Sequence, residues 1–343
     1  MLGFGALVLT PTLDGRWPNV FGLTAMDGNW YRLILNQGYL NYWVPGVNSA
    51  WPFFPLYPWL ADGPTRLGAP VGPSLIAISW LSALVALGGV AVLVSRRFDR
   101  KTTILAVWLM ALLPGSIGLV LSYSDSLFVA GQVWALVVID GIARSRTAGR
   151  PMSRWAWWQV GTLTAVATAS RPNGFLLVIV ALVAVWCIDR RWRAAIAATV
   201  PSAVFLIGWI VYCERKVGRP FVFLLAKDAW IEWPIWRFVL HPLSRDALPF
   251  HVGVAVVVVA VASPSLRRLP VWWLWSIVLL VVPSLLLGVE GLARYVTLAA
   301  PLPVACALTL SQRPVWVQRL AVVVATVGFL FLGCSVVRYS WVP

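Results

Sequence analysis

Asp27 offers a carboxylate that could take part in catalysis. It lies in the segment Met26–Tyr31, which is followed by Gly38 and Tyr39. A carboxylate is a simple general base, because it can take a proton from an attacking hydroxyl group. Ionisable groups close to hydrocarbon are costly, and those found there commonly serve function. Asp27 is therefore the first candidate for a catalytic residue. The alternative is that it only caps a helix, since Asp is a favoured cap.

Further ionisable groups stand in turns between apolar runs. Asp125 lies in Ser122–Phe128, Arg171 and Asn173 lie in Ser170–Gly174, and Arg294 follows Glu290. A guanidinium group grips two phosphate oxygens at once, so either arginine could hold a phosphate. A structural ion pair between Asp125 and Arg171 is the alternative.

Metal and cofactor chemistry finds little support in the residue pattern. The chain has two histidines and four cysteines, without the spacing of a zinc site or a disulfide framework. It also has no close Asp-x-Asp pair that could hold a metal-bound nucleotide sugar. We therefore expect neither a metal nor another cofactor.

The elements that position these groups are predicted to be membrane helices. Hydrophobic residues make up 60% of the 343 and charged residues only 11%, where a soluble domain has about a quarter charged. Apolar runs long enough to cross a bilayer recur along the chain. Ten full spans are predicted, near 73–94, 102–121, 126–143, 156–170, 174–188, 194–212, 248–263, 271–288, 295–310 and 317–337. Met1–Thr10 is only half a span, and we interpret it as a truncated first helix or the result of a misplaced initiator.

The distribution of Lys and Arg predicts the orientation. One set of alternate loops holds fifteen basic residues against three acids, Asp99, Asp140 and Asp189, and should be cytoplasmic. Asp27, Asp125, Arg171 and Arg294 then face outward. The net charge of +15 is explained by this topology and by anionic lipid, so we do not expect nucleic-acid binding.

Two extracytoplasmic segments, 12–72 and 213–247, are too long for simple turns. In the first, Trp30, Leu33 and Ile34 share a helical face over 27–37, which predicts a short interfacial helix. The sequence Phe53–Pro58 has two prolines three residues apart, which should prevent a helix interior. We expect a rigid aromatic entry into the membrane there.

Together these segments resemble the PIG-V-like mannosyltransferases in order and spacing. The resemblance covers nearly the whole chain, and its motifs are Asp27–Tyr31 with Gly38-Tyr39, Phe53–Pro58, Tyr123–Phe128, Arg171–Gly174, Arg294-Tyr295 with Pro301, and the outer-loop stretches Lys227–Trp230 and Trp233–Trp236. Two positions depart from the usual pattern: Met26 stands where Trp is usual, and Asp125 where Glu is usual.

The resemblance implies a single GT-C-type glycosyltransferase domain over 1–343. Such an enzyme transfers mannose, or another hexose, from a polyprenyl-phosphate donor to a lipid or glycolipid acceptor. It implies Asp27 as the catalytic base, in an inverting mechanism, on the outer face of what we expect to be a bacterial cytoplasmic membrane. We assign Arg171 and Arg294 to the donor phosphate. The sugar and acceptor contacts are expected to be Asp125, Asn173, Trp30, Tyr31 and Tyr57.

Two other functions remain open. The chain could be a catalytically silent subunit that scaffolds another glycosyltransferase, which the change at Met26 and the short N-terminal segment favour. It could also be a lipid transporter, although we find no inverted halves with matched broken helices. Activity on a polyprenyl-linked donor separates the three.

The predicted orientation can be tested by cysteine labelling in intact cells. Cysteines introduced at Ser145 and Ser311 should be shielded from an impermeant thiol reagent, because both positions lie in basic loops, whereas one at Asn48 should react. Labelling of the unsubstituted chain gives the background from its four native cysteines. Reaction at Ser145 and Ser311 from outside would reverse the orientation.

Overall fold

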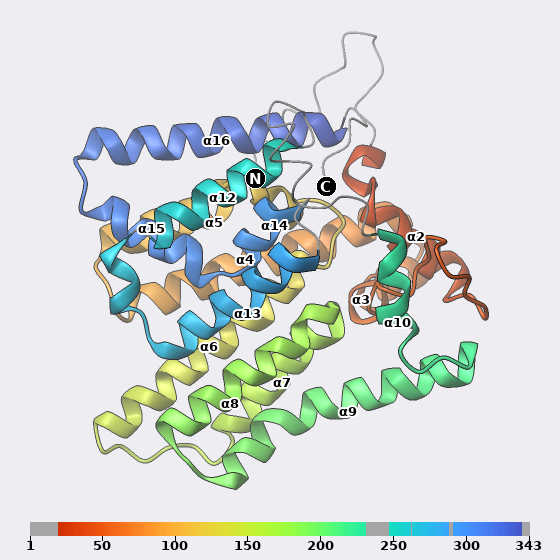
Figure 1. The fold of residues 1–343 in the computed structure, drawn as a ribbon, viewed down its shortest axis with the longest axis horizontal. Coiled ribbons are helices and arrows are strands. Elements are labelled where there is room, and N and C mark those ends of the chain that lie inside the picture. Colours follow the sequence, from red (N-terminus) through yellow and green to blue (C-terminus); the bar gives the residue numbers. More distant parts are fainter. Residues whose placement is uncertain (1–19, 231–246, 262, 288–290, 338–343) are drawn as a thin grey trace.

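The computed structural model describes residues 20–230, 247–261, 263–287 and 291–337, and all regular structure in these residues is helical (Figure 1). The helices are η1 (Val20–Thr24), α2 (Asp27–Gln37), α3 (Leu56–Arg66), α4 (Val71–Ser95), α5 (Arg100–Leu112), η2 (Pro114–Leu119), α6 (Asp125–Thr147), α7 (Ala156–Ser170), η3 (Pro172–Phe175), α8 (Leu176–Ile188), α9 (Trp192–Val217), α10 (Val222–Leu225), η4 (Ala226–Trp230), α12 (Ala247–Val261), η5 (Pro264–Arg268), α13 (Val271–Leu287), α14 (Leu292–Leu298), α15 (Pro301–Ser311) and α16 (Val315–Val337). The predicted half-span Met1–Thr10 lies outside the described residues, as does 231–246 of the second long segment.

Each of the ten predicted spans contains helix, and the polytopic all-α class is confirmed. In the described residues, four helices are long and apolar enough to cross a bilayer singly, namely α4, α6, α9 and α16. α14 and α15 pass the same test only as a pair, and α8, α12 and α13 contribute shorter apolar stretches. The sequence predicted ten full-length spans, but in the described residues several of these apolar segments form helices that are shorter than a full span or are broken.

Helix α6 is the centre of the bundle. It packs on α4 and α7, while α7 packs in turn on α9. Within its apolar stretch 78% of the residues are buried, against 22% for α16, which lies along one edge of the molecule (Figure 1). The outer helices expose large aliphatic side chains, among them Val204, Ile207, Val324 and Val327. Exposed apolar surface of this kind is typical of a face that contacts lipid. We infer that other helices surround α6, whereas lipid covers the outward faces of α9 and α16.

Two predicted spans are broken by proline. The predicted span 102–121 ends as an α-helix at Leu112, because Pro114 has no N–H and starts the 3₁₀ helix η2 instead. The predicted span 295–310 is bent by 83° between α14 and α15, where Pro301 starts the second helix. Gln132 of α6 meets this break: its side chain accepts from the Ala300 N–H at 3.2 Å and donates to Ser276 Oγ at 3.0 Å. The buried Ala300 N–H at the break thus finds an acceptor inside the protein, as a membrane interior requires.

The outer segments gather at one end of the bundle, where α2, α3 and α10 lie (Figure 1). The predicted helix over 27–37 is confirmed as α2, but its buried residues are Gly28, Tyr31 and Ile34, while Trp30 and Leu33 are half-buried. The two prolines of Phe53–Pro58 lie outside a helix interior, as predicted, because they stand at the start of α3: Pro55 is its N-cap. α3 starts at Leu56 with Pro58 in its first turn, where a missing N–H costs nothing.

Candidate active site

The carboxylate of Asp125 is the centre of a buried ion cluster. Asp125 begins α6, and its side chain is fully buried. The Arg294 guanidinium grips both of its oxygens, through Nε to Oδ2 and through Nη2 to Oδ1, the latter at 2.9 Å. Arg171 forms an ion pair with the same carboxylate through Nη1. The sequence alternative of an Asp125–Arg171 pair is therefore realised, with Arg294 as a third member.

Arg294 joins this centre to the predicted base. Its Nη2 also donates to Asp27 Oδ2 at 2.7 Å. Two carboxylates and two guanidinium groups then compensate each other. Of the four side chains, Asp27 is the most accessible, at 23% exposed against 14% for Arg294, 11% for Arg171 and none for Asp125. Asp27 is thus the member that a bound substrate could reach first.

Asp27 does not cap α2 through its side chain. The N-cap position is held by Met26, and no side chain caps the helix there. Met26 has a φ of 54°, a left-handed conformation that is unfavourable for a long side chain. Such strain commonly accumulates where geometry at a functional site matters. Here it accompanies the turn that brings Asp27 to Arg294.

Close backbone approaches make room for the cluster. A Cβ at Gly118 of η2 would collide with Asp125 Oδ2, and one at Gly28 would collide with Ser122 Oγ. The proline that ended the predicted span 102–121 therefore has a structural use. It starts the tight 3₁₀ turn that lays the glycine backbone of η2 against the carboxylate.

Aromatic rings back the two guanidinium groups. The Arg294 guanidinium lies 4.4 Å from the centre of the Tyr123 ring, and that of Arg171 lies 5.8 Å from Tyr295. A cation is attracted to a ring face, the more strongly when water is excluded. The rings therefore hold the arginines while their N–H groups point to the carboxylates.

The predicted sugar and acceptor residues divide into two layers. Tyr31 lies in the cluster's surroundings, where its hydroxyl donates to Ser124 Oγ at 2.7 Å. Burial raises the pKa of Tyr31 to about 12, against the lowering effect of the Arg171 charge, so Tyr31 stays a donor. Tyr57 lies behind it, ring against ring at 4.7 Å, and its hydroxyl is bonded to Leu75 O and Ser79 Oγ of α4. We interpret Tyr57 as a support of Tyr31.

Trp30 and Asn173 are placed at the borders of this region. The Trp30 ring stacks on Phe53 at 6.0 Å and is half-buried. Asn173 is half-buried in η3, two residues after Arg171. Both keep partial access while their backbones are fixed, which is compatible with the predicted contact role.

Residues that sequence reasoning missed surround the same cluster. Ser122, Tyr123, Ser124 and Ser126 flank Asp125 and are buried. In the described part of the chain, Ser122 Oγ and Ser126 Oγ have no hydrogen-bond partner. Buried hydroxyls are normally satisfied, so orphaned ones call for an explanation such as an absent ligand or water. The signal in the sequence was the run Ser-Tyr-Ser-Asp-Ser, which offered several donors beside one acid.

Lys227 is a further missed residue. Burial, with the nearby positive charge of Arg171, lowers the pKa of Lys227 to about 8. Burial and the Arg294 charge likewise lower the pKa of Arg171. Both shifts mean that this region disfavours additional positive charge until an anion is present. The sequence offered Lys227 only as part of an aromatic outer loop.

Metal ligation is another use to which two neighbouring carboxylates can be put. Within the described ranges, no group of three or more His, Cys, Asp or Glu side chains is placed to hold a metal ion. Arginine, tyrosine and serine are the neighbours of Asp27 and Asp125, and these side chains suit an anion better than a cation. The prediction of a metal-free site remains a prediction.

Comparison with solved structures identifies the fold. No protein-family model matches the chain, and no curated protein matches it in sequence. The apo oligosaccharyltransferase of Archaeoglobus fulgidus is similar, with a TM-score of 0.60 at 14% identity over 99% of this chain and 55% of that one. The archaeal oligosaccharyltransferase AglB in complex with an inhibitory peptide and a dolichol-phosphate gives 0.52 at 12% identity over 99% of this chain and 55% of that one.

The likeness covers this chain nearly entirely and about half the length of those structures. At such low identity it is a likeness of fold. The chain is a multi-pass, all-α membrane protein with a GT-C-type fold, as the sequence predicted.

The two acids should differ sharply in their effect on stability. Asp125→Asn leaves two buried arginines with one carboxylate, and we expect the free energy of unfolding to fall by roughly 3–5 kcal/mol. Asp27→Asn leaves Arg294 paired with Asp125, so the change should stay within about 1 kcal/mol. Thermal unfolding of both variants in detergent tests this difference. Equal losses of stability would mean that the cluster does not depend on Asp125.

Proposed function

We propose that this protein transfers a hexose, mannose by its family resemblance, from a polyprenyl-phosphate donor to a lipid or glycolipid acceptor. The reaction takes place at the extracytoplasmic end of the bundle. The observation that carries the proposal is the accessible carboxylate of Asp27 held by an arginine that is itself anchored on a buried acid. The GT-C-type fold supports the same reaction class.

The chemistry needs a base and compensation for a departing phosphate. Asp27 takes the proton of the acceptor hydroxyl as its oxygen bonds to the anomeric carbon. The bond from that carbon to the phosphate oxygen breaks, and its electron pair leaves with the polyprenyl phosphate. Arg171 and Arg294 stabilise the developing negative charge. Attack opposite the leaving group inverts the anomeric centre.

Arg294 links donor binding to the state of the base. In the free protein its Nη2 is shared by Asp27 and Asp125, and the four charges cancel. A donor phosphate adds a negative charge and competes for the same N–H groups. Asp27 then loses its hydrogen bond from Arg294, which leaves the carboxylate oxygen open to the acceptor hydroxyl. The base is thus restrained until a donor is present.

The aromatic surroundings suit the sugar and the acceptor. Tyr31 is buried against Phe53 and Tyr57, which fixes its ring beside Asp27. Trp30 remains half-buried on the same helix. In our proposal Trp30 and Tyr31 position the sugar ring, and Asn173 supplies amide hydrogen bonds from the Arg171 side.

Replacing the base tests this function most directly. Asp27→Asn should lower sugar transfer from a polyprenyl-phosphate donor by on the order of a hundredfold or more, because an amide cannot accept the proton. The measurement is the initial rate of radiolabelled sugar transfer by the purified protein in lipid.

Asp62→Asn is the matched control. This acid belongs to α3 in the same outer segment and pairs with Arg66 at 2.7 Å, so its loss should leave transfer unchanged. Full activity of Asp27→Asn would falsify the base assignment. A wild type that binds the donor but transfers to none of several lipid acceptors would instead favour the silent scaffolding subunit.

Donor binding should also depend on pH through Lys227. Its pKa of about 8 lies below the usual value because its charged form is disfavoured in the free protein. A bound phosphodiester favours the charged form, so binding takes up a proton above pH 8. Affinity should therefore fall as pH rises through about 8, by at most tenfold per pH unit.

Calorimetric titration with a phosphodiester donor analogue between pH 7 and 10 measures this dependence. Lys227→Met should remove the fall, and Lys227→Arg should remove it while keeping the affinity, because arginine stays charged. The same slope in Lys227→Met would assign the proton uptake to another group.

A further inference from the structure

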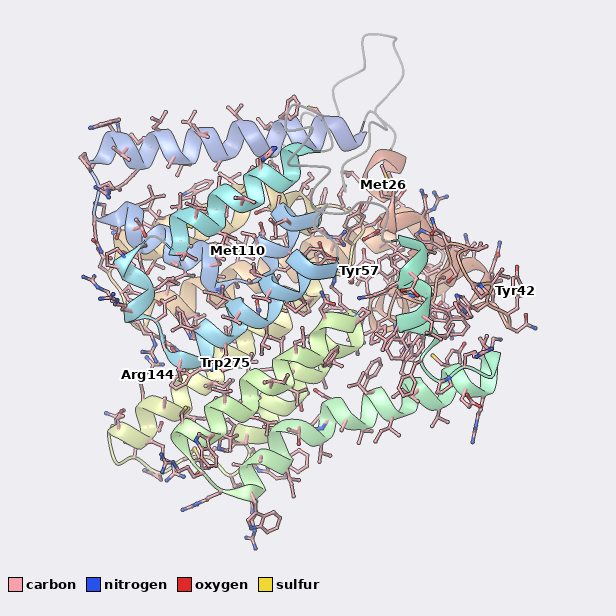
Figure 2. The ribbon with its side chains drawn as sticks, viewed as in Figure 1. Met26, Tyr42, Tyr57, Met110, Arg144 and Trp275 are labelled. Atoms are coloured by element: carbon pink, nitrogen blue, oxygen red, sulfur yellow. The ribbon has the colours of Figure 1, made fainter. Side chains whose placement is uncertain are left out.

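A concave surface lies at the opposite end of the bundle from Asp27. It has a volume of about 710 Å³ and is bordered by the end of α6, the start of α7 and the turn from α8 into α9. In Figure 2, Arg144 marks this end of α6, far from Met26 and Tyr57 beside the candidate active site. The sequence assigns this end to the cytoplasmic face.

Asp189 organises the basic side of this pocket. Its side chain is only 3% exposed. It accepts a hydrogen bond from Trp157 Nε1 at 2.9 Å, forms an ion pair with Arg146 and lies 3.6 Å from Arg191. A buried carboxylate with three partners fixes the positions of those partners. The pocket is thus built around a fixed frame.

The lining carries more positive charge than this acid can compensate. It contains five arginines and one carboxylate. Within the described residues, Arg150, Arg154 and Arg193 have no carboxylate partner, and all three are exposed. The positive-inside rule accounts for basic loops, but it does not require that they converge on one hollow.

Tryptophan completes the lining. Trp155 is 56% exposed and Trp158 is 38% exposed at the same site. Tryptophan prefers the boundary between hydrocarbon and headgroups. The pocket therefore opens at the depth at which phospholipids have their phosphodiester groups. Free phosphate would not need this apolar border, whereas a lipid would place its glycerol and upper chains there.

We propose that this pocket binds the headgroup of an anionic phospholipid from the adjacent leaflet. Arg150, Arg154 and Arg193 contact the phosphodiester, Asp189 keeps the neighbouring Arg146 and Arg191 in place, and Trp155 and Trp158 contact the glycerol region. Basic pockets between membrane helices on the cytoplasmic side suit anionic headgroups. The assignment does not depend on the proposed sugar transfer.

Native mass spectrometry of the purified, delipidated protein tests this site. The protein is titrated with phosphatidylglycerol or with phosphatidylcholine of the same acyl chains. We expect phosphatidylglycerol to bind preferentially. The triple variant Arg150→Gln/Arg154→Gln/Arg193→Gln should lose about a hundredfold in affinity, since each arginine contributes roughly fivefold.

A matched triple variant, Arg268→Gln/Arg313→Gln/Arg319→Gln, removes the same charge from exposed positions on the same face that do not line the pocket. It should bind like the wild type. Equal loss in both triple variants, or loss in neither, would overturn the proposal. Competition by inorganic phosphate or glycerol phosphate as effective as by the lipid would reassign the pocket to soluble phosphate. If the pocket triple variant does not fold, Arg154→Glu gives the same comparison with one change.

Discussion

The buried carboxylate of Asp125 is the constraint on which the outer end of this protein depends. A charge without access to water is tolerated only when partners surround it. The partners of Asp125 are Arg171, which joins α7 to η3, and Arg294 of α14. Meeting that requirement draws three distant parts of the chain together. This arrangement also positions Asp27, because Nη2 of Arg294 donates a hydrogen bond to Asp27 as well as to Asp125.

Both ends of the bundle have a buried aspartate surrounded by arginines, but the two clusters differ in net charge. At each end a buried aspartate gathers arginines and an aromatic neighbour. The outer cluster is neutral, so an arriving anion must displace an existing contact, which suits a reaction step. The cluster around Asp189 has more arginines than carboxylates. An anion can therefore bind there without breaking an existing ion pair, which suits the stable binding of a lipid headgroup. In our two proposals, sugar transfer and lipid binding are thereby placed at opposite ends of the bundle.

The sequence predicted the class of fold and the main polar groups, because hydropathy and topology depend on composition over long windows. Asp27, Asp125, Arg171 and Arg294 were all found as charges at the outer edge, and the structure brings them together. Spacing could not reveal that Arg294 bridges two acids, or that Tyr123 and Lys227 belong to the same region. Those are long-range contacts, which local patterns do not encode. The proline breaks at Pro114 and Pro301 were missed for a related reason: apolar composition continues across them. At the second break, Gln132 of α6 bonds the Ala300 N–H, and this contact comes from a distant part of the chain.

The distance along the chain between Asp27 and Arg294 has a consequence for biosynthesis. The two residues are 267 positions apart, and Asp125 and Arg294 are 169 apart. A nascent chain inserts its early helices long before α14 is translated, so Asp125 waits in the membrane with Arg171 as its only strong partner from this cluster. Until Arg294 is made, the two acids of the cluster, Asp27 and Asp125, have one arginine between them. The outer cluster can therefore close only after residue 294 of 343 has been made, so the contact between Asp27 and Arg294 is among the last to form during synthesis.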